Sequence, residues 1–183
     1  MVLTTKVYTA EDLWAMPGDE PWEIWDGELR TVPSSGEEAS GVAAQVLVSL
    51  GIYLRANKIG HVTGADGTYI LLRDPDTVVV PDVAFVRWDS RPEGQSRSAK
   101  YGPVRPDLAV EVQSPSDEPK DMAEKRRLYA RAGVPLLWWV DPAKRTVTVY
   151  RLGREPFVLT ETDALDGGEV LPGLRIPVAE IFG

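Results

Sequence analysis

The sequence predicts an α/β (α+β) fold in which helices flank a mixed central sheet. The first indication is the order strand, helix, strand over residues 108–113, 119–132 and 136–140, because such a unit favours a parallel pair of strands. The second is an apolar stripe with a 3.6-residue repeat over residues 38–57, which is typical of an amphipathic helix. Short apolar runs on both sides of these segments supply the other strands.

Length and composition limit the class of protein. The 183 residues fit one domain, which we divide into an N-terminal extension (1–35), a core (36–151) and a C-terminal wrap (152–183). With no cysteine and one histidine, His61, the chain lacks disulfides, thiolate zinc sites and histidine-rich metal clusters. The first residues do not form the apolar core of a signal peptide, and no apolar run approaches the ~20 residues of a membrane span. We therefore expect a soluble cytoplasmic protein.

The first expected elements are a short helix and a hairpin. Thr9 is followed three residues later by Asp12, a spacing typical of a capped helix start, so residues 10–15 are predicted to be helical. Residues 22–32 are predicted to form a hairpin. Its turn is Asp26-Gly27, a dipeptide that two-residue hairpin turns prefer.

The remaining elements follow from apolar patterning and from turn residues. The helix over residues 38–57 precedes two predicted strands, 61–73 and 77–86, which a turn at Asp74-Pro75-Asp76 joins. Residues 87–105 contain few apolar groups and are predicted to form a long loop. The later elements are a buried strand at 108–113, a helix at 117–132 that starts near Pro119 and stops at Gly133, strands at 136–140 and 146–151, and an irregular tail over 171–182 ending in a short helical turn.

Candidate catalytic side chains lie near the end of the strand at 108–113. Side chains alternate along a strand, so Glu111 and Gln113 are predicted neighbours on one face, at the edge where sites occur in open α/β sheets. Asp82 follows Pro81, which cannot donate a ladder hydrogen bond and indicates a bulge or an irregular strand. Isolated carboxylates are costly to bury, and a divalent cation would justify two of them together.

A lysine joins these acids from the second long helix. Lys125 falls on the predicted buried stripe, four residues before Tyr129. A core position is the favoured interpretation of Tyr129, and a catalytic role is the alternative. A buried lysine needs an anionic partner, and Asp82 and Glu111 would supply one over the end of the sheet. Alternatively, Lys125 snorkels to the surface or pairs with Asp121 at i−4. Spacing alone also leaves the two acids open to other interpretations, as ordinary strand-end carboxylates or as the acid pair of a glycoside hydrolase.

Six segments carry a resemblance that covers most of the chain when they are taken in order. They are Trp22-Glu-Ile-Trp-Asp-Gly-Glu, Pro81-Asp-Val-Ala-Phe-Val, Pro106-Asp-Leu-Ala-Val-Glu-Val-Gln-Ser-Pro-Ser, Glu124-Lys-Arg-Arg-Leu-Tyr-Ala-Arg-Ala-Gly-Val, Trp138-Trp-Val-Asp-Pro and Leu171-Pro-Gly-Leu-Arg-Ile-Pro. Together they resemble the Uma family of putative restriction endonucleases, which belongs to the PD-(D/E)XK nuclease-like superfamily. The resemblance implies a restriction-endonuclease-like fold.

The resemblance also implies an endonuclease that hydrolyses DNA phosphodiester bonds with Mg²⁺ or Mn²⁺. On this pattern Asp82 and Glu111 would bind the metal, and the backbone carbonyl of Val112 would add a ligand. The superfamily lysine normally lies two residues after the glutamate, where this chain has Gln113, which supplies neither positive charge nor a general base. Either Lys125 has taken over that role, or the chain is a weak or inactive enzyme that serves as a binding or assembly module.

The resemblance is less complete near the N-terminus. An upstream acid is expected at the site, and Glu23 matches the family motif better than Glu38. The other interpretation of Glu23 is a surface charge on the hairpin. The family often has a histidine just before the first long helix, but residues 35–41 contain none, which weakens any transfer of detail to this part of the chain.

The expected nucleic-acid surface is local, because a net charge of −8 argues against binding by the whole surface. A basic loop with an aromatic side chain can follow a phosphate backbone, although a solvated loop is the alternative. The basic stretch comprises Arg87, Trp88, Arg91, Arg97, Lys100 and Arg105 in the loop and Lys120, Arg126, Arg127 and Arg131 on the second helix. Exposed strand edges or the hairpin at Trp22 and Trp25 could also pair two copies into a homodimer or a higher homo-oligomer.

Overall fold

A six-stranded mixed sheet forms the centre of the protein. The computed structural model describes residues 6–17, 21–91, 93, 94 and 105–183. The strand order is β10 (Phe157–Leu159), β9 (Thr146–Arg151), β8 (Leu136–Asp141), β7 (Leu108–Val112), β6 (Val83–Arg87) and β3 (Gly60–Thr63). β7 and β8 pair in parallel and the other neighbours are antiparallel, so the predicted mixed sheet is confirmed.

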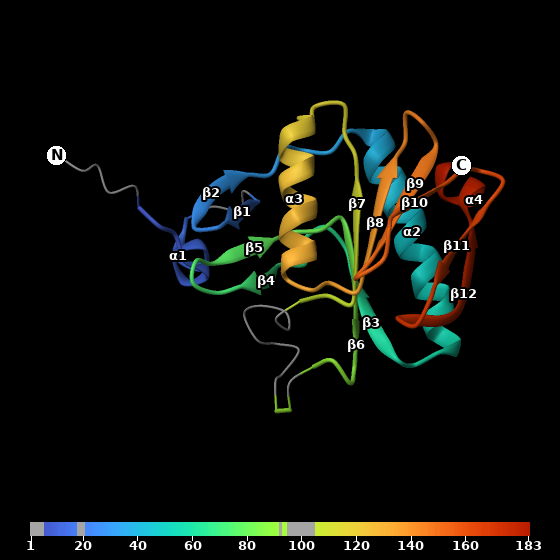
Figure 1. Cartoon of the computed structure of the whole chain (residues 1–183), viewed down its shortest axis with the longest axis horizontal. Helices are drawn as coiled ribbons and strands as arrows, with labels where there is room; N and C mark the ends of the chain where they lie inside the picture. The colour runs from blue at the N-terminus through green and yellow to red at the C-terminus, as the bar shows by residue number, and fades with distance from the viewer. Residues whose placement is uncertain (1–5, 18–20, 92, 95–104) are drawn as a thin grey trace.

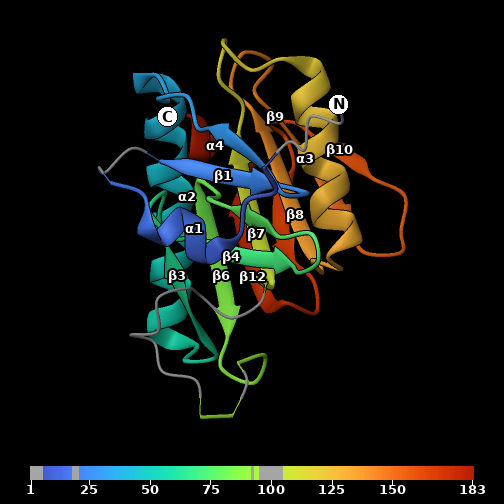
Figure 2. The same cartoon turned by 90° about the vertical axis from the view of Figure 1, so that its left-hand side faces the viewer.

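Helices and smaller sheets cover the two faces of this sheet (Figure 1). On one side lie α2 (Glu37–Ala56), the pair β11 (Ala164–Gly167) and β12 (Leu171–Pro177), and α4 (Val178–Phe182). On the other side lies α3 (Pro119–Arg131), which is the crossover between the parallel strands β7 and β8. Figure 2 shows the second sheet on this side, with the order β2 (Glu28–Thr31), β1 (Trp22–Trp25), β5 (Thr77–Val79) and β4 (Tyr69–Leu72).

Side chains of β7 alternate between the two faces as the sequence predicts. Leu108, Val110 and Val112 belong to the apolar core beneath α2. Ala109 belongs to the separate core that contains Tyr129 of α3. Because Glu111 follows the same alternation as Ala109, the strand directs this carboxylate toward the α3 side of the sheet.

Two predicted strands are each divided between the two sheets, and this corrects the sequence interpretation. The predicted strand 61–73 is β3 in the six-stranded sheet and β4 in the four-stranded sheet. The predicted strand 77–86 is likewise β5 and β6, separated by residues 80–82. Proline at position 81 cannot donate a ladder hydrogen bond, so the chain leaves one sheet at this point and enters the other. Asp82 therefore lies at a crossing between two sheets, not at a bulge within one strand.

The tail is more regular than predicted. Residues 164–177 form the antiparallel pair β11 and β12, whose inward side chains Leu165, Leu171 and Ile176 are buried. The expected short helical turn is confirmed as α4. The buried side chains of β12 are Leu171, Leu174 and Ile176, and the exposed Pro172 and Gly173 interrupt their alternation, so the sequence pattern does not indicate a strand.

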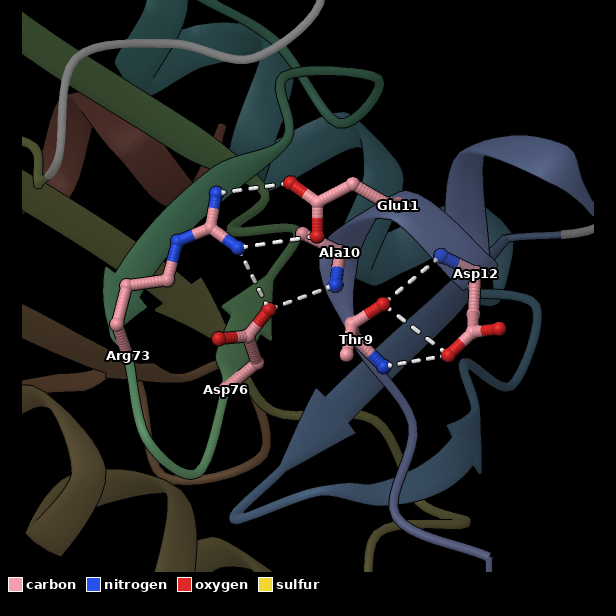
Figure 3. A network of polar contacts seen from close by, with 6 residues as sticks. All are labelled: Thr9, Ala10, Glu11, Asp12, Arg73 and Asp76. Atoms are coloured by element: carbon pink, nitrogen blue, oxygen red, sulfur yellow. Dashed lines mark hydrogen bonds and ion pairs between the residues drawn. The ribbon is translucent and has the colours of Figure 1, made fainter.

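A network of polar contacts attaches α1 (Ala10–Ala15) to the turn between β4 and β5 (Figure 3). The side chain of Thr9 accepts a hydrogen bond from Asp12 N–H, and Asp12 accepts one from Thr9 N–H, which confirms the predicted cap. Asp76 connects α1 to the turn, because it accepts hydrogen bonds from Ala10 N–H at 2.7 Å and from Arg73 at 2.8 Å. Arg73 also donates to Glu11 at 3.2 Å. We call these residues (Thr9, Ala10, Glu11, Asp12, Arg73 and Asp76) the α1 clamp.

The helix α2 is longer and more apolar than most surface helices. By length and composition alone it could cross a membrane, so the expectation that no apolar run approaches that length does not hold for this segment. One stripe of α2, with Val42, Val46 and Leu50, packs into the core of the six-stranded sheet. Core helices of water-soluble proteins meet the same length and composition test.

Candidate active site

A cavity of about 290 Å³ opens between the two sheets and the N-terminal half of α3. Its wall includes Glu23 from β1, Asp82 from the crossing between β5 and β6, Glu111 from β7 and Lys125 from α3. These four side chains come from four different segments of the chain. The fold therefore gathers at one place four of the five residues that the sequence predicts to be catalytic.

Lys125 makes two buried ion pairs at the centre of this cavity wall. Its ammonium nitrogen Nζ lies 2.9 Å from Oε1 and 3.0 Å from Oε2 of Glu111, and 3.0 Å from Oε1 of Glu23. The Lys125 side chain is only 13% exposed. The predicted inward position of Lys125 is thus confirmed, and its partners are Glu111 and Glu23 rather than Asp121.

Glu23 is held by three donors and is not a surface charge of the hairpin. Its Oε1 accepts a hydrogen bond from Val80 N–H at 2.8 Å in addition to the contact with Lys125. Its Oε2 accepts one from the indole N–H of Trp25 at 2.7 Å. The side chain is 3% exposed. A buried carboxylate with this many donors has a fixed orientation, so Glu23 fixes the position of Lys125 in turn.

Tyr129 belongs to the same network, and the core position that the sequence favours for it is confirmed by its burial. Its hydroxyl donates to Oε1 of Glu111 at 2.5 Å. The sequence signal for this contact was present, because Tyr129 lies one helical turn after Lys125 and both point toward the sheet. We call Glu23, Glu111, Lys125 and Tyr129 the buried cluster.

Asp82 lies beside the buried cluster and has a different environment. Its Oδ2 accepts a hydrogen bond from Val112 N–H at 2.7 Å, which ties the crossing between the sheets to the end of β7. Among the described residues, none donates a hydrogen bond to Oδ1. Asp82 thus presents one carboxylate oxygen at the wall of the cavity without a protein partner from the described part of the chain.

Burial and crowding of negative charge change the proton affinities here. Burial, reinforced by the neighbouring carboxylates of Asp82 and Glu23 and opposed by Lys125, raises the pKa of Glu111 to about 8. Burial also raises the pKa of Asp82, against the hydrogen bond from Val112. The carboxylates of Glu111 and Glu23 outweigh burial at Lys125 and raise its pKa. Lys125 therefore stays charged, and its ammonium group pairs with both Glu111 and Glu23.

The cavity wall as a whole is strongly acidic. Its charged residues comprise six carboxylates and two cations: Glu23, Asp82, Glu111, Asp117, Glu118, Asp121, Arg30 and Lys125. Such a surface attracts cations and repels a bare phosphate group. Bound divalent cations would remove this repulsion.

The residues at the cavity fit a divalent cation only in part. Asp82 and Glu111 are hard oxygen donors of the kind that Mg²⁺ and Mn²⁺ prefer. Both oxygens of Glu111 already contact Lys125, however. Within the described residues, no three His, Cys, Asp or Glu side chains are arranged to hold a metal ion. Two carboxylates with water molecules completing the shell are a usual arrangement for Mg²⁺, so the donor set is adequate in type.

The other predicted site residues are placed less favourably. Gln113 is half-buried, its backbone N–H donates to the carbonyl of Val140 at 2.8 Å, and its side chain is absent from the described lining of the cavity. β7 ends at Val112, so the alternation that would bring Gln113 beside Glu111 ends there. Val112 lines the cavity, and the role of its carbonyl as a ligand stays a prediction.

The predicted basic surface is partly engaged within the protein. Arg87 pairs with Asp89, Arg105 donates to the carbonyl of Ala132, and Arg131 pairs with Asp26. Arg126 lies over the ring of Trp139, a residue of the cavity wall, at 5.1 Å. Of the predicted stretch, Arg97 and Lys100 lie outside the described residues.

Comparisons with known proteins show the family of the chain and support its fold. A family model described as Uma2, putative restriction endonuclease, matches residues 10–179. No curated protein matches the sequence. The crystal structure of a putative nuclease belonging to DUF820 from Anabaena variabilis ATCC 29413 is similar, with a TM-score of 0.81 and 20% sequence identity, over 96% of this chain and 97% of that one. At this identity the similarity establishes the fold, whereas the family match spans nearly the whole chain. The chain belongs to the Uma2 family of putative restriction endonucleases.

Proposed function

We propose that this protein is an endonuclease that hydrolyses DNA phosphodiester bonds with Mg²⁺ or Mn²⁺. The observation that carries the proposal is the acidic cavity in which a buried lysine contacts Glu111 and Glu23 beside Asp82. Family membership supports a nuclease-like activity on nucleic acid. The metal requirement, and DNA as the substrate, are our extension of that coarser assignment.

Each residue at the cavity has a proposed role that follows from its position. Asp82, with one oxygen directed to the cavity, and Glu111 would hold the cation. When bound, a divalent cation supplies Lewis-acid chemistry, activating water and neutralising charge on the scissile phosphate. Lys125 places a fixed positive charge at the cavity wall, where a phosphate oxygen gains negative charge during the reaction.

The remaining members of the buried cluster act by positioning. Tyr129 and Lys125 hold the Glu111 carboxylate in one orientation. Glu23, itself fixed by Trp25 and Val80, holds Lys125 from the other side. Such outer partners keep ligands and charges in place, and their loss weakens a metal site even though they do not touch the metal.

Cleavage of supercoiled plasmid in Mg²⁺ or Mn²⁺ tests the proposal with a matched pair of variants. Asp82→Asn removes a proposed ligand, and we expect it to slow cleavage about 100-fold or more. Asp76→Asn is the control, because Asp76 also accepts a backbone hydrogen bond at 2.7 Å but lies in the α1 clamp. It should cleave at the wild-type rate. Equal cleavage by wild type and Asp82→Asn, or no cleavage by wild type, would remove the proposal.

A second candidate is a nuclease-like fold that serves as a binding or assembly module without catalysis. The observation in its favour is that all the carboxylate oxygens of Glu23 and Glu111 already have partners in the protein. Titration calorimetry with Mn²⁺ separates the two candidates. Binding that Glu111→Gln abolishes supports the enzyme, and absence of binding to the wild type supports the module.

A further inference from the structure

The outward face of α2 carries an apolar stripe that no other part of the described structure covers. Two of its residues, Val48 and Ile52, are 54% and 63% exposed. Residues in steps of three or four positions lie on one face of a helix. Glu38, Ser40, Gln45 and Ala56 are exposed outside these steps, and six other exposed residues of α2 follow the steps from one end to the other. They are Glu37, Gly41, Ala44, Val48, Ile52 and Arg55.

The stripe has opposite charges at its two ends. Glu37 is in the first turn of α2 and Arg55 is in the last turn. The residues between them are small or apolar and carry no charge. If a second α2 lay antiparallel on this face, Glu37 of each copy would meet Arg55 of the other, and both ends would be neutralised.

The stripe is also close to symmetric about its own centre. Glu37 and Arg55 are equally distant from position 46, and so are Gly41 and Gly51, and Ala44 and Val48. In a twofold interface, residue i contacts residue j of the partner while j contacts i. An antiparallel α2 pair centred at position 46 would therefore place Glu37 against Arg55, Gly41 against Gly51, and Ala44 against Val48 of the partner helix. Because the interface is twofold, each of these contacts would occur twice.

Two glycines give this face the flatness that close helix packing requires. Glycine destabilises the interior of a helix relative to alanine. A Cβ atom added at Gly41 or Gly51 would meet no other atom within 4 Å, so nothing inside the protein requires glycine at either position. In an antiparallel pair, however, the two backbones could approach closely at these residues, with Ile52 of the partner next to Gly41.

We infer that α2 is the interface of a homodimer in which two copies of this chain pack their α2 helices antiparallel. The partner is thus a second copy of the chain, recognised by Val48 near the centre, by Ile52 farther along the helix, and by Glu37 and Arg55 at the ends. The interface lies on the opposite side of the six-stranded sheet from α3 (Figure 1), so it does not cover the cavity wall. The inference is independent of the proposed nuclease activity.

The expected dimer is weak. With 20 residues, α2 is roughly 30 Å long, and a stripe about 10 Å wide on it presents roughly 300 Å². Standard interfaces bury about 800 Å² on each partner, so the α2 contact alone favours an equilibrium that depends on protein concentration. Sedimentation velocity of the full chain from micromolar to millimolar concentration is the appropriate measurement.

Charge reversal tests both the surface and the antiparallel arrangement. Arg55→Glu places two acids together at each end of the pair and should weaken the dimer roughly tenfold. The double variant Glu37→Arg/Arg55→Glu restores opposite charges and should recover wild-type association. Val48→Glu, at an exposed position, should give a monomer. Circular dichroism and urea unfolding of each variant establish that the fold is retained.

Three results would overturn the inference. The first is a wild-type chain that stays monomeric at all concentrations, and the second is a dimer that Val48→Glu leaves intact. The third is a double variant that associates no better than Arg55→Glu, which would exclude the antiparallel register. Binding of the monomer to phosphatidylcholine and phosphatidylserine vesicles, abolished by Val48→Glu, would assign the face to a lipid surface instead.

Discussion

The α1 clamp and the buried cluster use the same kinds of charged groups in different surroundings. In the α1 clamp, the ion-paired side chains of Arg73 and Glu11 are 48% and 67% exposed. In the buried cluster, Lys125 and Glu111 are 13% and 9% exposed. Both clusters connect segments that are distant in the sequence. Water solvates Arg73 and Glu11, although Asp76 of the same clamp is buried, and it is largely removed from Lys125 and Glu111, so the loss of hydration free energy is larger in the buried cluster.

This difference in solvation indicates whether each cluster contributes to stability or to catalysis. Exposed ion pairs add little stability individually, and the α1 clamp gains mainly from the cap and from the backbone hydrogen bond to Asp76. A buried ion pair often contributes no more to stability than apolar side chains of the same size would. The buried cluster is therefore costly to maintain, and its place at a cavity beside Asp82 favours a catalytic reason for its presence.

The largest expected effect comes from removing one cation from each cluster. Lys125→Met leaves the carboxylates of Glu111 and Glu23 buried without their positive partner, and should lower the free energy of unfolding by about 3–5 kcal/mol. Arg73→Met is the matched change in the α1 clamp and should cost only about 1 kcal/mol, because Glu11 is exposed and the buried Asp76 keeps the hydrogen bond from Ala10 N–H. Urea unfolding measures both. Similar losses for the two variants would contradict the distinction between the clusters.

A smaller effect is expected when the buried cluster loses both charges of a pair. In Lys125→Met/Glu111→Gln, the one remaining carboxylate, Glu23, keeps the hydrogen bonds from Val80 and Trp25. The double variant should therefore recover most of the stability that Lys125→Met loses, and end within about 2 kcal/mol of the wild type. If instead the losses in free energy of unfolding from the two substitutions simply added, the buried cluster would be a net source of stability.

The two clusters should also respond to pH in opposite directions. The pKa of Glu111 is about 8 in the folded protein, above the ordinary glutamate value of 4.5, so its contribution to stability is fully present below pH 4.5 and is lost as pH rises through 8. The Arg73 guanidinium lowers the pKa of Glu11, so the contribution of Glu11 is present above pH 4.5 and is lost on acidification.

Unfolding free energies measured from pH 3 to 9 test this contrast. The wild type should lose stability relative to Glu111→Gln between pH 5 and 8, and relative to Glu11→Gln below pH 4.5. Curves for wild type and Glu111→Gln that run parallel above pH 5 would show that burial does not govern the proton affinity of Glu111.

The smallest effect should come from the cap of the α1 clamp. Thr9→Ala removes the side-chain acceptor of Asp12 N–H, and should cost about 1 kcal/mol. Because α1 packs only through a few apolar residues such as Ala10 and Leu13, the loss should appear as local opening of this helix. Hydrogen exchange of the α1 amides measures it, and unchanged exchange there would mean that Asp76 alone holds the helix.

Local periodicity was enough to predict part of this site. Strand alternation placed Glu111 on the face away from Leu108, and helical spacing placed Lys125 toward the sheet, where it contacts Glu111. The contact of Glu23 with Val80 joins residues 57 positions apart through the pairing of β1 with β5. No local pattern encodes that pairing, so the anchoring of Glu23 could not be predicted.

The absence of a local signal for long-range strand pairing also explains why the two strand predictions were wrong. The segments 61–73 and 77–86 each contain apolar runs interrupted by polar residues or glycine, and this pattern does not reveal where a strand leaves one sheet for another. Pro81 marked an irregularity, but its consequence, the crossing that brings Asp82 to the cavity, depends on the second sheet. The prediction that Gln113 lies beside Glu111 extends the alternation one residue past the end of β7, and it stays a prediction.

The claim that the buried cluster serves cleavage is tested most directly by the plasmid-cleavage rate of Lys125→Met/Glu111→Gln. This variant is expected to fold, because the pair is removed together, yet it lacks the lysine charge and a proposed metal ligand. We predict a native circular dichroism spectrum and at least about 100-fold slower cleavage in Mg²⁺ or Mn²⁺ than the wild type. A folded double variant that cleaves plasmid at the wild-type rate would contradict the claim.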